Sequence, residues 1–187
     1  MAETQVQVPV CLVREYQEAP KILRGFFANL SDLIQYLKNE RYIYESTALK
    51  WEEGIKRAYQ YLDDYDIIKA LEEIHKSLRG MQLVLDKIST NAFWKKQSIP
   101  EALKKKYENI AESIRDFLDI LWHIARYYAS RYNSPPIICA TWNDKTSKPY
   151  WWMRDGDIIG SIGTIISVAR DLQPLINEIR NQVSKTS

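Results

Sequence analysis

Two pairs of histidine and carboxylate residues have the spacing of metal ligands on a helix. Glu72 and His75 are separated by three positions, and Asp119 and His123 by four. Residues at these separations share a helix face, so each pair could provide two ligands. A di-metal centre in a helical bundle also needs glutamates from two further helices, with every ligand pointing inward. Both histidines fall beside the apolar core positions of their segments, so we predict boundary or surface histidines, no metal site and no cofactor.

Motifs that mark common catalytic sites are missing from the sequence. It contains no GxSxG nucleophile elbow, HExxH zinc motif, Walker A loop or GxGxxG loop. The RxxxxH spacing of helical ribonucleases of the HEPN kind is also missing, because Arg115 and His123 stand too far apart. Cys11 and Cys139 form no CxxC motif, and no motif around Cys139 marks it as a nucleophile. A non-enzymatic function is therefore favoured, although a catalytic site built from residues distant in sequence would leave no such motif.

A basic and aromatic segment is the most suggestive binding signal. Phe93 and Trp94 are followed directly by two lysines, and a run of three further lysines lies one to two helical turns into the next predicted helix. Positive charge near a helix N-terminus, which adds exposed amide groups, suits phosphate contacts that need no base recognition. The alternative is a solvated helix face, where lysine runs are common. The nucleic-acid-binding candidates in this segment are Trp94, Lys95, Lys96, Lys104, Lys105 and Lys106.

A long segment without helical periodicity, residues 134–156, is rich in aromatic side chains and proline. Connections of this length are uncommon in compact domains and are often functional. Its rings and cations interleave as on a platform that stacks single-stranded nucleic acid, but clustered tryptophans also seal loops onto a core or fill subunit interfaces. Residues 137–142 and 150–153 could pair as a small hairpin. Further nucleic-acid candidates are Lys145, Lys148 and Arg154, and the partner-binding candidates are Trp142, Tyr150, Trp151 and Trp152.

Helices must position these residues. Three segments carry apolar residues alternately three and four positions apart, a period of 3.5 that indicates left-handed bundle packing with small crossing angles. Pro174 should kink or split the last segment. Helices are predicted over residues 20–39, 46–63, 67–88 and 158–183, with a longer one before the aromatic loop that follows the capping box at 98–101. The sequence therefore predicts an all-α fold, a single helical-bundle domain of about five helices over residues 20–187.

The first 19 residues have a different pattern. Val6, Val8, Val10 and Leu12 alternate with polar or small residues, which is the period of an extended segment with one apolar face. Pro9 restricts such a segment to an edge or to an arm outside a sheet. We therefore expect an extended N-terminal arm over residues 1–19 that packs on the bundle or reaches a neighbouring subunit.

Composition excludes several classes of protein. The 187 residues are 45% hydrophobic and 27% charged, as in globular proteins, and the net charge of +2 creates no global field towards nucleic acid or an anionic membrane. The N-terminus lacks the basic and apolar regions of a secretory signal. The longest apolar stretches are shorter than the roughly 20 residues of a membrane span. We therefore expect a cytoplasmic (intracellular) protein without a membrane span, or a virion protein if the source is viral.

By architecture alone, such a bundle is typical of small subunits in larger assemblies. Examples are the helical coat proteins of filamentous archaeal viruses and the helical small subunits of CRISPR effector complexes. The first hypothesis is a non-enzymatic assembly subunit that contacts other protein subunits or copies of itself and binds nucleic-acid backbone through its basic patches. The second is a protein-interaction or adaptor bundle without nucleic acid, and the third is a metal-dependent helical-bundle enzyme.

Overall fold

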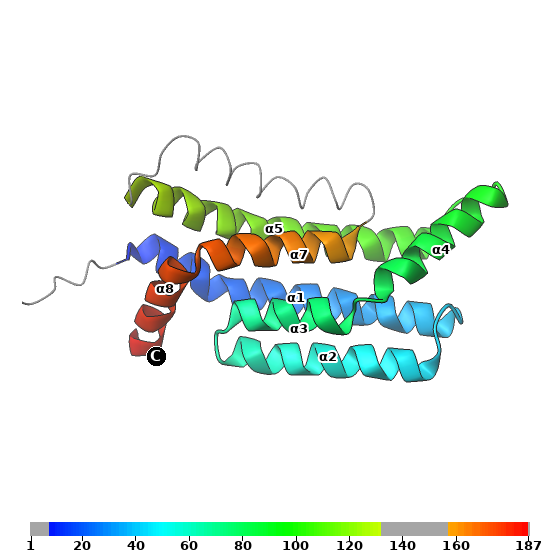
Figure 1. Ribbon diagram of the computed structural model, residues 1–187, viewed down its shortest axis with the longest axis horizontal. Coiled ribbons are helices and arrows are strands. Elements are labelled where there is room, and N and C mark those ends of the chain that lie inside the picture. Colours follow the sequence, from blue (N-terminus) through cyan, green and yellow to red (C-terminus); the bar gives the residue numbers. More distant parts are fainter. Residues whose placement is uncertain (1–7, 132–156, 187) are drawn as a thin grey trace, which may run out of the picture.

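The computed structural model describes residues 8–131 and 157–186, and within these ranges the chain forms helices and no strands. The helices are α1 (Val10–Asn39), α2 (Glu45–Asp63), α3 (Ile67–Ser77), α4 (Met81–Trp94), α5 (Glu101–Arg131), α7 (Ile158–Asp171) and α8 (Gln173–Thr186). The predicted all-α class is confirmed (Figure 1). The expected number of about five helices is slightly low, because two of the predicted segments are each divided into two helices. None of the helices within the described ranges combines the length and the apolar character needed to cross a membrane.

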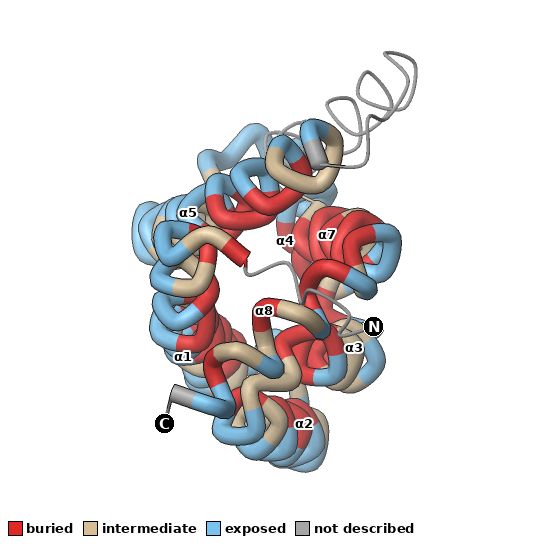
Figure 2. The backbone as a smooth tube through the Cα atoms, turned by 90° about the vertical axis from the view of Figure 1, so that its left-hand side faces the viewer, coloured by how far each residue is buried: buried red, intermediate tan, exposed pale blue. Residues whose placement is uncertain are grey.

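Most of the helices lie lengthwise beside one another (Figure 1). The main packing pairs are α1 with α5, α2 with α3, α1 with α2, and α3 with α7. Helix α8 turns across one end of the bundle, where it packs on α1, and α4 projects beyond the other end (Figure 1). Buried residues line the inward faces of α1, α5 and α7 in the view along the bundle (Figure 2). The result is one continuous hydrophobic core.

The 3.5-residue apolar pattern correctly predicts which residues form this core. Every position of the pattern in 67–88 and in 158–183 is buried. In α5 all of its positions are buried except Tyr107 and Tyr128, which are half-buried and pack against the core. Helix α5 begins at Glu101, next to the predicted start, and the Pro100 carbonyl accepts the first backbone hydrogen bonds of the helix.

The predicted N-terminal arm over residues 1–19 is wrong for residues 10–19, which form the first turns of α1. Residues 1–7 lie outside the described ranges. The apolar alternation at Val10 and Leu12 coincides with the start of a second pattern that continues through the whole helix. Its spacing is again alternately four and three residues, and its members are all buried: Leu12, Tyr16, Ala19, Leu23, Phe26, Leu30, Leu33 and Leu37. Burial of this longer stripe favours the helix over an extended arm.

Pro20 therefore lies inside α1 and not in its first turn. A proline has no amide donor, so the helix lacks the hydrogen bond to the Tyr16 carbonyl. The same residue makes a long-range contact through its side chain, because its buried hydroxyl donates to the Tyr65 carbonyl at 2.9 Å. Burial raises the pKa of this hydroxyl to about 12, while Arg180 opposes the rise. The contact fixes the N-terminal half of α1 on the turn between α2 and α3.

The predicted helix over 67–88 is wrong as a single helix, because the chain breaks between Ser77 and Met81. Gly80 immediately precedes α4, and glycine has a low propensity for a helix interior. The Met81 amide donates to the Leu78 carbonyl at 2.9 Å, which closes a tight turn at the break. Leu78 and Met81 are both buried, so the apolar pattern continues across a change of helix direction.

The division predicted at Pro174 is confirmed. Helix α7 ends at Asp171 and α8 begins at Gln173, so the proline occupies the first turn of α8. An amide at that position has no helical partner, so its absence costs little there. The predicted hairpin and aromatic loop over 134–156 lie outside the described residues.

Candidate binding site at the α4–α5 tip

Helix α4 leaves the bundle along its length. Its buried side chains are Met81, Leu85 and Ile88, all within its first eight residues. No residue between Ile88 and Leu103 is buried, and α4 projects beyond the neighbouring helices (Figure 1). We call residues 89–102 the α4–α5 tip. Within this segment only Ile99 packs against the core, as a half-buried side chain.

The tip carries two large aromatic side chains in solvent. Phe93 is 74% exposed and Trp94 is 77% exposed. Their ring centroids are 5.6 Å apart with nearly perpendicular planes, a favourable edge-to-face arrangement. Exposed aromatic surface of this kind marks an interaction site more often than a structural one, since burying it would have stabilised the fold. The pair can stack against a base or fill a pocket on a protein partner.

Two cations adjoin these rings. Lys95 and Lys96 are exposed, and neither forms an ion pair with another described residue. The Lys96 amide donates to the Phe93 carbonyl at 3.1 Å and the Gln97 amide to the Ala92 carbonyl at 2.8 Å, which ends α4 in a tight turn. Lys96 has a φ of 51°, in the left-handed region where glycine is the favoured residue. A lysine at this position is therefore not explained by backbone preference.

The second lysine run does not form one surface with the first. Lys104, Lys105 and Lys106 are consecutive helical residues of α5, so they point in directions about 100° apart. Lys104 pairs with Glu101 at 3.3 Å, and Lys106 is half-buried. Residues 101–112 contain three lysines and three glutamates, so this stretch carries no net charge. The basic excess of the site is therefore at Lys95 and Lys96.

The two histidines lie beside the core, as predicted. His75 is half-buried and packs near Gly163 of α7, while burial, with Arg79 and then Arg170, lowers its pKa. The other histidine, His123, is exposed, and its Nδ1 lies 2.7 Å from Glu15 Oε1. Glu72, the predicted partner of His75, instead pairs with Arg170 at 2.9 Å. Within the described ranges no three histidine, cysteine or carboxylate side chains are grouped as metal ligands.

Seven predicted site residues fall between α5 and α7, outside the described residues. They are Trp142, Lys145, Lys148, Tyr150, Trp151, Trp152 and Arg154. Their assignment to nucleic acid or to a protein partner stays a prediction.

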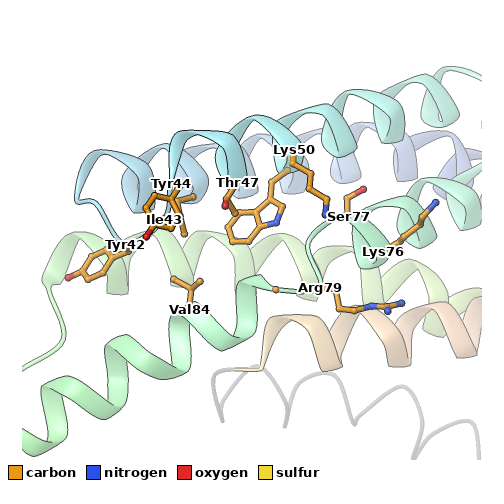
Figure 3. A pocket seen from close by; sticks show the side chains of 11 residues that line it. Tyr42, Ile43, Tyr44, Thr47, Lys50, Lys76, Ser77, Arg79 and Val84 are labelled. Atoms are coloured by element: carbon orange, nitrogen blue, oxygen red, sulfur yellow. The ribbon is translucent and has the colours of Figure 1, made fainter.

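Sequence reasoning missed a pocket of about 640 Å³ on the side of α4 that faces α2 (Figure 3). Its charged lining residues are Lys50, Lys76 and Arg79, which come from α2, from α3 and from the break after α3. No motif could have revealed it, because the pocket exists only where α4 turns away at Gly80. The scattered cations give no local pattern in the sequence.

Comparisons with protein-family models, curated proteins and solved structures gave no match for this chain. Fold and site together define an all-α bundle with a projecting aromatic and basic tip. Its function must therefore be inferred from the chemistry of the described side chains.

Proposed function

We propose that this protein is a non-enzymatic subunit of a larger assembly that holds nucleic-acid backbone at its α4–α5 tip. The observation that carries the proposal is the combination of two exposed rings, Phe93 and Trp94, with two adjacent lysines on a segment that lies outside the core. Other subunits or further copies of the chain are the protein partners in this proposal, inside a cell or in a virion.

The chemistry of the tip favours a single strand. A base stacks on an exposed aromatic ring with little dependence on sequence, and lysines contact the phosphates that flank it. The net charge of only +2 means that affinity must come from such a local arrangement. The left-handed backbone at Lys96 supports a role for its side chain, because glycine would suit that backbone better.

The test measures binding of a fluorescein-labelled oligothymidine strand and of a duplex by fluorescence anisotropy, from about 50 to about 200 mM salt. We expect the wild-type affinity for the single strand to fall steeply with salt. Trp94→Ala should weaken binding by about tenfold or more, because one stacked base contributes roughly 1–3 kcal/mol. The double variant Lys95→Gln/Lys96→Gly should reduce the slope of log affinity against log salt by about 0.7 for each phosphate that the variant no longer neutralises.

The chain provides matched controls for both variants. Lys21→Gln/Lys185→Gln removes the same charge from exposed positions on α1 and α8, and Leu83→Ala removes an exposed apolar side chain from α4 itself. Lys96→Gly relieves the positive φ, so a loss of binding in that variant does not come from unfolding. Equal weakening by the control pair, or wild-type binding by both tip variants, would contradict the proposal.

A further inference from the structure

The pocket beside α4 exists because two helices diverge. Helix α4 turns away after Gly80, and the loop after α1 then faces it across an opening (Figure 3). Val84 points from α4 towards that loop. Trp51 of α2, which is almost fully buried, also lines the pocket. The volume of about 640 Å³ is in the range of pockets that hold a small organic ligand.

The pocket has a strongly one-sided charge. Its lining includes Lys50, Lys76 and Arg79 and contains no carboxylate. None of the three cations forms an ion pair with another residue in the described ranges. The two α3 carboxylates that could neutralise them are already engaged: Glu73 with Arg57 at 2.7 Å, and Glu72 with Arg170 at 2.9 Å.

Because Glu72 and Glu73 form ion pairs with arginines that do not line the pocket, the pocket keeps an excess of positive charge. Burial opposes ionisation of Glu73, but hydrogen bonds from Arg57 and Ser77, together with the charges of Arg57 and Lys76, outweigh it and lower the pKa of this carboxyl. Glu73 therefore stays ionised at neutral pH, with Arg57 as its ion-pair partner. Three cations within one pocket repel one another, so an anion that enters gains from all three.

The other end of the pocket is aromatic. Tyr42 and Tyr44 belong to the loop after α1, whereas the three cations lie towards α3 (Figure 3). Tyr44 is 83% exposed, so its ring is available to a ligand, and Thr47 adds a hydroxyl between the two ends. A ligand that contacts both ends needs an anionic group at one end and a flat ring at the other.

We propose that this pocket binds a nucleotide, with the phosphates held by Lys50, Lys76 and Arg79 and the base against Tyr42 and Tyr44. The phosphate is recognised as a multiply charged anion by lysine and arginine donors. Either a free nucleotide or one nucleotide of a single strand offers this chemistry. The pocket proposal does not require strand binding at the α4–α5 tip, because the two sites share no residue.

Isothermal titration calorimetry of the full chain with adenosine diphosphate and uridine diphosphate tests the proposal, with adenosine and inorganic phosphate as the two halves of the ligand. We expect both diphosphates to bind with one-to-one stoichiometry and each half to bind at least tenfold more weakly. Lys50→Gln/Lys76→Gln and Arg79→Gln should each weaken binding at least tenfold. Lys21→Gln/Lys185→Gln should leave it unchanged.

A second variant tests the cavity without altering charge. Val84→Phe puts a ring into the opening at a half-buried position, so the fold should tolerate it while nucleotide binding falls. If a short oligothymidine strand displaces the diphosphate from both the wild type and Trp94→Ala, the natural occupant is one nucleotide of a strand. If the strand does not displace it, the natural occupant is a free nucleotide.

Absence of nucleotide binding by the folded wild type would overturn the pocket proposal and leave the tip proposal intact. Binding that survives both Lys50→Gln/Lys76→Gln and Val84→Phe would also overturn it, since the ligand would then lie elsewhere. Conversely, loss of strand binding in the tip variants with nucleotide binding retained separates the two sites.

Discussion

The α2–α3 pair and α4 are neighbours in sequence but differ completely in packing. Gly54 of α2 lies so close to Ser77 of α3 that a Cβ at Gly54 would overlap the Ser77 side chain. Helix α4 starts only four residues after Ser77, yet it buries three side chains in its first eight residues and none after Ile88. Buried side chains continue past the break at Gly80 as far as Ile88, and the exposed tip begins only where the apolar pattern ends.

The exposed residues of α4 after Ile88 can change at little cost to the core, whereas the buried positions of α1, α2 and α3 cannot. This separation suits a subunit in which a packed bundle presents a tip to other molecules. Substitutions on either side of the division should differ in their effects, and the difference should be greatest for large aromatic side chains.

Replacement of one phenylalanine in each region should give the largest difference. Phe27 is fully buried in α1, and Phe27→Ala should lower the free energy of unfolding by about 3–5 kcal/mol. The same truncation at the exposed Phe93 should change it by less than about 0.5 kcal/mol. Urea unfolding followed by circular dichroism measures both values. A large loss with Phe93→Ala would show that the tip is packed against the bundle.

The close approach of α2 and α3 is tested by Gly54→Ala. The added methyl overlaps Ser77, so we expect destabilisation of about 1–3 kcal/mol. Gly25→Ala is the matched control, because its Cβ meets nothing within 4 Å and α1 continues through it. There the gain in helix propensity should stabilise the protein by up to about 1 kcal/mol. Equal effects of the two substitutions, measured by urea unfolding, would be inconsistent with the helix spacing.

The anchor of the N-terminal half of α1 is tested by Tyr16→Phe. This change removes the hydroxyl that bonds to the Tyr65 carbonyl and keeps the buried ring. The loss of stability should be about 1 kcal/mol, the net contribution of a hydrogen bond. Amide hydrogen exchange should then show faster exchange in the first turns of α1 and unchanged exchange in α5. An equal increase of amide exchange in α1 and α5 would contradict a local anchor.

The smallest effect concerns pH. His75 has a lowered pKa in the folded state, so the unfolded chain binds its proton more readily and stability falls as the pH drops below about 6.5. Glu73, whose pKa is also lowered, contributes stability above its ordinary pKa that is lost in stronger acid. His75→Gln should flatten stability between about pH 7 and pH 5 and leave the acid loss below that range. A wild-type stability that rises between pH 7 and pH 5 would contradict this sign.

Helical periodicity in the sequence predicts the core well but predicts helix ends poorly. Burial follows from the 3.5-residue spacing, so the spacing places Leu78 and Met81 correctly although the helix breaks between them. Glycine at position 80 disfavours a helix interior by only about 1 kcal/mol, and apolar periodicity does not register a penalty of this kind. The first turns of α1 escape prediction because Val10 and Leu12 fit a period of two, while Leu12 also begins the helical stripe.

The candidate site is predictable in part. The proximity of Trp94, Lys95 and Lys96 follows from sequence adjacency, but their exposure depends on the direction of α4. Proximity in sequence groups Lys104, Lys105 and Lys106 with them, but the structure pairs Lys104 with Glu101 and half-buries Lys106. The three cations of the pocket meet only through tertiary structure.

Strand binding at the tip is best decided by size-exclusion chromatography with light scattering, at low and high salt, with and without a single-stranded oligonucleotide. We predict that the wild type co-elutes with the strand as a larger species at low salt and separates from it at high salt. The triple variant Trp94→Ala/Lys95→Gln/Lys96→Gly should elute in the presence of the strand as the protein does alone. A salt-insensitive wild-type monomer that ignores the strand, or a tip variant that still co-elutes with it, would contradict nucleic-acid binding at the α4–α5 tip.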